Sequence, residues 1–165
     1  MSVEENKAAT FADIYNAHAR DVYRYAYYLS GDASTAQDVT SEAFLRIWMS
    51  AEPIRVSTVK SYLFVIARNL YLHQLRHTKR QQPLDETLTS KESVETSAEA
   101  RQALARTMQA MAALPEIDRA ALVLRTMEGL PYEEIAAILK ISIAAAKVKV
   151  HRARLRLGAY EHVHA

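Results

Sequence analysis

Residues 130–156 predict two short helices joined by a tight turn, and they constrain the fold more than any other stretch. Between Lys140 and Arg156 there are six basic residues and no acidic one. This pattern indicates a helix-turn-helix whose second helix enters a DNA groove, and the alternative is a solvated amphipathic helix. Apolar residues recur at helical spacing on both sides of the turn, at Ile135, Ala136 and Leu139 and at Ile143, Ala146, Val150, Ala153 and Leu157.

The composition favours an all-α protein. Among 165 residues there are only three Gly and four Pro, and half of the residues are hydrophobic. The absence of Cys excludes disulfides, thiol catalysis and Cys-based zinc sites, and it fits a reducing cytoplasm. No run of 18 apolar residues and no signal-peptide pattern is present. We therefore expect a soluble, cytoplasmic protein of one or two small domains.

The N-terminal half predicts three helices, over residues 10–29, 34–50 and 58–78. Helical periodicity defines the first, and Gly31 ends it. Ser34 with Gln37 forms a capping box for the second, which Pro53 ends. These helices are long enough to bury a common core.

The C-terminal half predicts about four helices behind a polar linker. Residues 80–95 lose periodicity and become acidic. Thr96 with Glu99 forms another capping box for a helix to Ala113, and Pro115 opens a helix that Gly129 ends. We therefore expect a domain over 1–80, a flexible linker over 81–95 and a second helical domain over 96–165.

Charge alternates along the chain although its net value is only +2. Residues 1–52 carry four basic and eight acidic side chains, and residues 53–82 carry six basic and none acidic. Residues 83–118 are again acidic and residues 119–165 again basic. A polyanion would therefore meet the chain at two separate places.

Taken together, these segments resemble the extracytoplasmic-function sigma factors of bacterial RNA polymerase over nearly the whole chain. Residues 36–48, AQDVTSEAFLRIW, are similar to the helix of that family that binds core polymerase, and 61–80 to its promoter-melting helix. Residues 114–139, Ile141-Ser142 and 147–154 are similar to its −35-element domain. The resemblance implies a transcription initiation factor whose partners are core polymerase (β′ and β subunits), promoter DNA and an anti-sigma factor.

The resemblance also assigns roles to individual residues. The positions that match the polymerase-binding surface are Asp38, Glu42, Phe44, Leu45 and Trp48. Two carboxylates one turn apart suit basic residues of a partner. The alternatives are that Phe44 and Trp48 are buried in the core and that the two carboxylates form a solvated acidic face.

The −10 element would be met by the loop 51–57 and the helix that follows it. A flipped base needs a polar rim and a stacking surface, which Arg55, Ser57 and Tyr62 could supply. Contact with the melted strand is expected from Arg68, Asn69, Tyr71, Arg76, Lys79 and Arg80. An ordinary loop and a solvated basic face are the alternatives.

The −35 element would be met by the last helix. Lys147, Val148, His151 and Arg152 match positions that approach bases, while Lys149, Arg154 and Arg156 are expected on phosphates and Ser142 at the helix cap. The family usually has Gly at the turn position of Lys140, where a left-handed residue other than Gly costs about 1–2 kcal/mol. The family usually has Thr and Val at the positions of Ala145 and Ala146, and a polar residue at the position of Val148. These replacements leave a smoother helix surface.

Two other classes of function are alternatives to initiation. A sigma-like decoy would bind an anti-sigma factor without starting transcription, although such a decoy need not keep the basic run 53–82. A metal site or an enzyme would rest on His73 with His77 and on His162 with His164. Two imidazoles without Cys or a nearby acid do not complete a zinc site, so we expect no metal, no cofactor, no small-molecule substrate and no catalytic residues.

Overall fold

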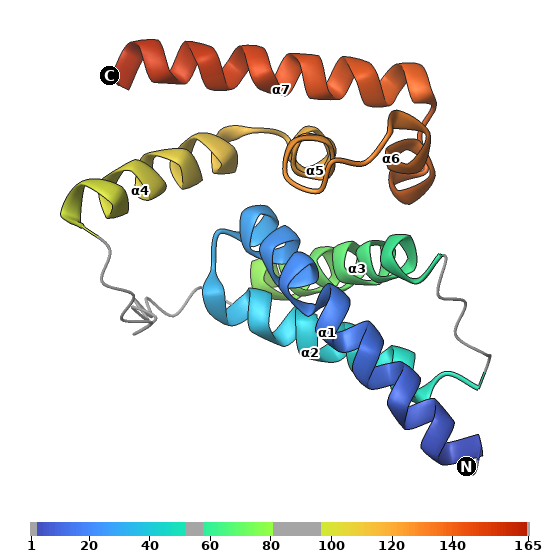
Figure 1. The fold of residues 1–165 in the computed structure, drawn as a ribbon. Coiled ribbons are helices and arrows are strands. Elements are labelled where there is room, and N and C mark those ends of the chain that lie inside the picture. Colours follow the sequence, from blue (N-terminus) through green and yellow to red (C-terminus); the bar gives the residue numbers. More distant parts are fainter. Residues whose placement is uncertain (1–2, 52–57, 81–96, 165) are drawn as a thin grey trace.

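A computed structural model describes residues 3–51, 58–80 and 97–164 of the chain, and within these ranges the molecule is all helical (Figure 1). Three helices form the N-terminal half: α1 (Val3–Ser30), α2 (Ala33–Met49) and α3 (Val59–Arg80). Four form the C-terminal half: α4 (Ala98–Ala113), α5 (Glu116–Thr126), α6 (Tyr132–Leu139) and α7 (Ile143–His164). None of the described helices is both long and apolar enough to cross a membrane.

Helix α1 begins seven residues before the predicted start at residue 10, whereas α2 and α3 begin and end within two residues of the prediction, and two caps differ. Asp32, not Ser34, caps α2, because Gly31 at φ +71° ends α1 and leaves Asp32 extended. The Thr35 amide then donates to Asp32 Oδ2 over 2.9 Å. Likewise Ser97 caps α4, with the Ala100 amide 3.2 Å from its hydroxyl. Asp and Ser are among the strongest N-cap residues, and Asp32 lies two residues before, and Ser97 one residue after, the predicted cap.

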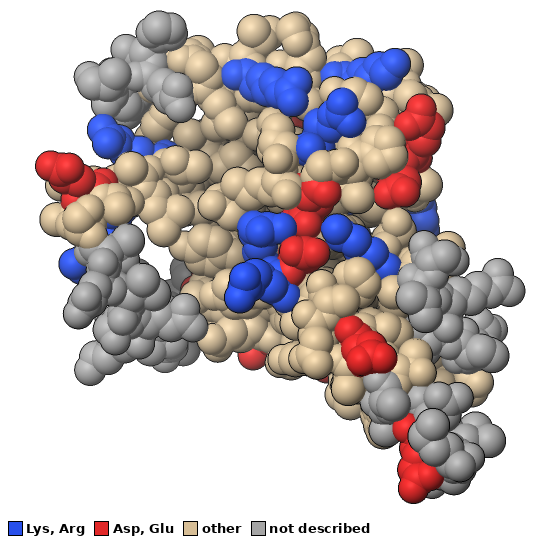
Figure 2. All heavy atoms as spheres, in the orientation of Figure 1, with Lys and Arg blue, Asp and Glu red and all other residues tan. Residues whose placement is uncertain are grey.

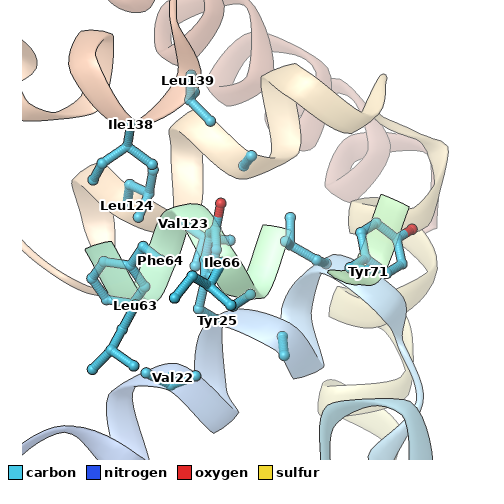
Figure 3. Close-up of a cluster of buried hydrophobic side chains, with 14 of the residues drawn as sticks. Val22, Tyr25, Leu63, Phe64, Ile66, Tyr71, Val123, Leu124, Ile138 and Leu139 are labelled. Carbon is cyan, nitrogen blue, oxygen red and sulfur yellow. The ribbon is translucent and has the colours of Figure 1, made fainter. Parts of the chain in front are cut away.

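The two halves stack on each other and share one core. In Figure 1, α5 and α6 lie between α7 and the three N-terminal helices, and α1 packs against both α4 and α5. Figure 3 shows Tyr25, Leu63 and Phe64 of the N-terminal half close to Val123, Leu124 and Ile138 of the C-terminal half. All of these side chains are buried and belong to one hydrophobic cluster.

Candidate protein and nucleic-acid interfaces

The last helix turns its basic side chains away from the core. Ala146, Val150 and Ala153 are fully buried against the rest of the C-terminal half. Figure 2 shows Lys and Arg side chains along the upper edge of the molecule, over α7. The exposed residues of α7 include most of the predicted −35 set, namely Lys147, Val148, His151, Arg152, Arg154 and Arg156. This helix therefore presents a cationic surface that a polyanion can reach.

The turn before α7 has the left-handed geometry that the sequence comparison implied. Lys140 lies at φ 56° and ψ 47°, and it is the only residue other than Gly with a positive φ in the described ranges. The Ile141 amide bonds back to the Ala136 carbonyl over 3.0 Å, which closes the end of α6. Ser142 accepts the Ala145 amide over 3.0 Å and so caps α7, as predicted.

A buried carboxylate lies beneath the basic surface of α7. Asp118 of α5 has only 2% of its side chain exposed, and its two oxygens face Lys149 Nζ at 3.8 Å and Arg152 Nε at 3.2 Å. Sequence reasoning missed this residue because 31 or more positions separate Asp118 from both cations. A second contact orients Lys147, whose ammonium lies 5.8 Å from the ring centre of Tyr132.

The predicted polymerase-binding residues on α2 divide into an exposed face and a buried one. Asp38, Glu42 and Leu45 are exposed, with Leu45 at 48%. Glu42 forms a long ion pair of 3.9 Å with Arg46, one turn away and also exposed. Such a pair contributes little and leaves the carboxylate available to a partner. Phe44 is buried, so the core alternative is correct for that side chain.

Trp48 differs from Phe44 in exposure, because 40% of Trp48 is exposed to solvent. It packs edge-on against Phe11 of α1, with ring centres 5.1 Å apart. Tyr15 packs in the same way against Phe44, at 5.0 Å. A shallow groove runs between α1 and α2 over these four rings, with Ser41 and Leu45 also lining it. An apolar groove beside exposed carboxylates suits a protein partner better than a nucleic acid.

The predicted −10 surface is only partly within the described residues. Arg55 and Ser57 lie outside them, as do the side chains of Lys79 and Arg80. Tyr62, Asn69 and Arg76 are exposed along α3, with Tyr62 at 52%. These three side chains are therefore available for contact with a strand.

In this arrangement Tyr71 is buried and only 16% of the Arg68 side chain is exposed, so neither side chain is open to a strand here. Arg68 donates from Nε and Nη2 to the two oxygens of Glu116 on α5, over 2.9 and 2.7 Å. Tyr71 is buried, and its hydroxyl accepts from Nη2 of Arg119, also on α5, over 3.3 Å. The physical reason is that α5, from the other half of the chain, covers this part of α3.

The described residues hold no group of three or more His, Cys, Asp or Glu side chains that could bind a metal ion. His73 and His77 are both exposed on α3. The side chains of His162 and His164 lie outside the described residues.

The family description "Sigma-70 region 2" matches residues 14–81, and "Sigma-70, region 4" matches residues 104–157. The extracytoplasmic-function RNA polymerase sigma factor SigM of Bacillus subtilis is 31% identical over 91% of this chain and 94% of its own length. SigE of Mycolicibacterium smegmatis is 32% identical over 90% of this chain, which spans only 60% of that longer protein.

Solved structures of similar fold are also sigma factors. RpoE of Bartonella quintana, in complex with the anti-sigma factor NepR, has a TM-score of 0.76 and 24% identity, over 93% of this chain and 98% of that one. CnrH, in complex with the cytosolic domain of CnrY, has a TM-score of 0.74 and 21% identity, over 96% and 91%. These likenesses support the two-domain helical fold.

Proposed function

The chain belongs to the extracytoplasmic-function sigma factors, and from this premise we propose which of its surfaces meet polymerase and which meet the promoter. Sigma factors are transcription initiation factors rather than enzymes: they bind core RNA polymerase and direct it to promoters. The observation that carries the assignment to this chain is that segments matching region 2 and region 4 occur together, in order. The decoy alternative is not favoured by these matches.

We propose that α2 docks on core polymerase. Asp38 and Glu42 offer carboxylates one turn apart on an exposed face, and Leu45 and Trp48 continue that face with apolar area. An apolar centre with a charged rim is typical of protein interfaces. Phe44 supports the face from within the core and does not itself touch the partner.

The promoter would be met by the two basic surfaces. In the proposed 96–165 domain, α7 enters the major groove at the −35 element, with Arg152 and Lys147 toward bases and Arg154 and Arg156 toward phosphates. In the proposed 1–80 domain, Tyr62, Asn69 and Arg76 contact the melted strand, joined by Arg68 once Glu116 releases it. An anti-sigma factor and a cytoplasmic location complete the proposal.

Association with core polymerase is the direct test of this assignment. The full chain, mixed with purified core enzyme, is expected to elute with it on size exclusion and to retard a promoter fragment that core alone does not bind. A chain that elutes separately at micromolar concentration would contradict the assignment.

A further inference from the structure

The exposed face of α7 carries an apolar ridge between its basic side chains. Val148 is 57% exposed, and Ala144, one turn before it, is exposed as well. The residues that α7 buries in the core are Ala146, Val150 and Ala153. Helical spacing places Val148 on the opposite side of the helix, on the outer edge where Figure 2 shows Lys and Arg side chains. We call Ala144 and Val148 the α7 ridge.

The cations on both sides of the α7 ridge are held back toward the body of the protein. Lys147 and Lys149 lie about 100° to either side of Val148 around the helix. The Lys147 ammonium lies 5.8 Å from the ring centre of Tyr132, at the start of α6. The Lys149 ammonium lies 3.8 Å from the buried carboxylate of Asp118 on α5, and only 20% of the Lys149 side chain is exposed. The ridge therefore faces directly outward between the two lysines.

The α7 ridge offers a base contact area but no hydrogen-bonding group. Neither an Ala nor a Val side chain contains a donor or an acceptor. In the major groove, the base edges present donors, acceptors and a single apolar group, the C5-methyl of thymine. An apolar side chain gains free energy when it packs on that methyl group, whereas it loses free energy when it removes water from the amino group of cytosine. The ridge therefore suits a T·A pair and disfavours a C·G pair.

The position of the α7 ridge along the helix also suits contact with a base. A recognition helix brings its N-terminal residues to the base edges. Helix α7 begins at Ile143, so Ala144 lies in its first turn and Val148 in its second. The cations around the ridge favour DNA over a protein partner.

We propose that Val148, with Ala144 beside it, reads the 5-methyl group of one thymine in the −35 element and so specifies a T·A pair at that position. The contact requires the proposed entry of α7 into the major groove, on which this inference rests. The basic side chains around the ridge supply charge and hydrogen bonds, and the ridge adds discrimination at one base pair.

Replacing single thymines by deoxyuridine tests the contact, because the change removes the methyl group and leaves every hydrogen-bonding group of the base in place. Core polymerase loaded with the full chain first selects a promoter duplex from a library randomised over the −35 and −10 elements. Each thymine of the selected −35 element, on either strand, is then replaced in turn. At one position deoxyuridine is expected to weaken binding by about fourfold, the effect of one methyl group withdrawn from apolar contact. At that position 5-methylcytosine should bind more tightly than cytosine by a similar factor.

The variant Val148→Ala identifies the residue that makes the contact. In this variant the thymine and deoxyuridine duplexes should bind equally, because the side chain that touches the methyl group is gone. Leu155→Ala is the matched control. Leu155 is 62% exposed on the same helix but lies about two turns further from its N-terminus, so the preference for thymine should persist in that variant. Both side chains are exposed, so neither substitution disturbs the core, and circular dichroism verifies the fold.

Two results would overturn the inference and leave the promoter assignment standing. One is a −35 element in which no deoxyuridine weakens binding, and the other is a preference for thymine that Val148→Ala retains in full. If Val148→Ala also associates more weakly with core polymerase while it retains that preference, Val148 contacts a protein partner instead. Recovery of no specific duplex from the library would contradict the proposed function and this inference together.

Discussion

Asp118 lies directly beneath Arg152, with the buried carboxylate 3.2 Å from the Nε of an arginine on the exposed face of α7. Asp118 Oδ2 accepts no hydrogen bond within the described residues, so the contact is an ion pair, and 46% of the Arg152 side chain is exposed. The guanidinium of an exposed arginine can pair with a guanine edge. We therefore expect Asp118 to act as a positioning residue for Arg152.

We expect Asp118→Asn, which keeps the side-chain shape, to weaken −35 DNA binding by about tenfold, within the range of one lost bidentate base contact. The loss should be concentrated at one base pair, because only one arginine is released. In an Arg152→Ala background the same substitution should have almost no further effect. Fluorescence anisotropy on a set of single-base variants of the site measures this. Additive losses across the double-mutant cycle would show that Asp118 acts only through overall stability.

Replacing Asp38 and Glu42 by Ala should weaken association with core polymerase by about tenfold, because both carboxylates are exposed and are proposed to meet basic residues of the partner. Stability should fall by less than about 0.5 kcal/mol, since the Glu42–Arg46 pair is exposed. The exposed Asp13→Ala on α1 is the matched control. Titration of labelled chain with core enzyme gives the affinities. Unchanged assembly of the double variant would show that the interface is elsewhere.

Lys140→Gly should raise the free energy of unfolding by about 1 kcal/mol, because Gly takes the left-handed conformation at φ 56° without the clash of a Cβ atom. Lys140→Ala removes the same charge but keeps the Cβ, so it should leave the stability close to that of the wild type. Urea unfolding of the three proteins separates the backbone effect from the charge effect. Equal stability of the Gly and Ala variants would contradict this account of the turn.

Tyr25→Phe should stabilise the chain by about 1 kcal/mol, the cost of a buried polar group without a partner. The Tyr25 ring is fully buried, and within the described residues its hydroxyl has no hydrogen-bond partner. The same burial raises the pKa of Tyr25. Tyr71→Phe is the matched control: it removes a hydroxyl that bonds to Arg119, so it should destabilise. Thermal unfolding by circular dichroism compares them, and a lower midpoint for Tyr25→Phe would contradict the prediction.

The elements that could be predicted from the sequence are those that depend on neighbouring residues. Periodicity located the helices, and the comparison of turn residues singled out Lys140, which is left-handed. The caps shifted by a residue or two because Asp32 and Ser97 compete with the predicted cap residues. Local sequence contains no information about contact partners that lie far away along the chain. The run 53–82 has no acid of its own, yet Arg68 is neutralised by Glu116, 48 positions away.

Run-off transcription tests most directly whether this chain directs polymerase to a promoter. Core polymerase with the purified chain should yield a transcript of defined length from the promoter that the chain recognises. Core alone should give none, and Arg152→Ala or Asp38→Ala/Glu42→Ala should reduce it. The absence of any transcript across a genomic promoter library, despite a folded chain and active core enzyme, would contradict the account.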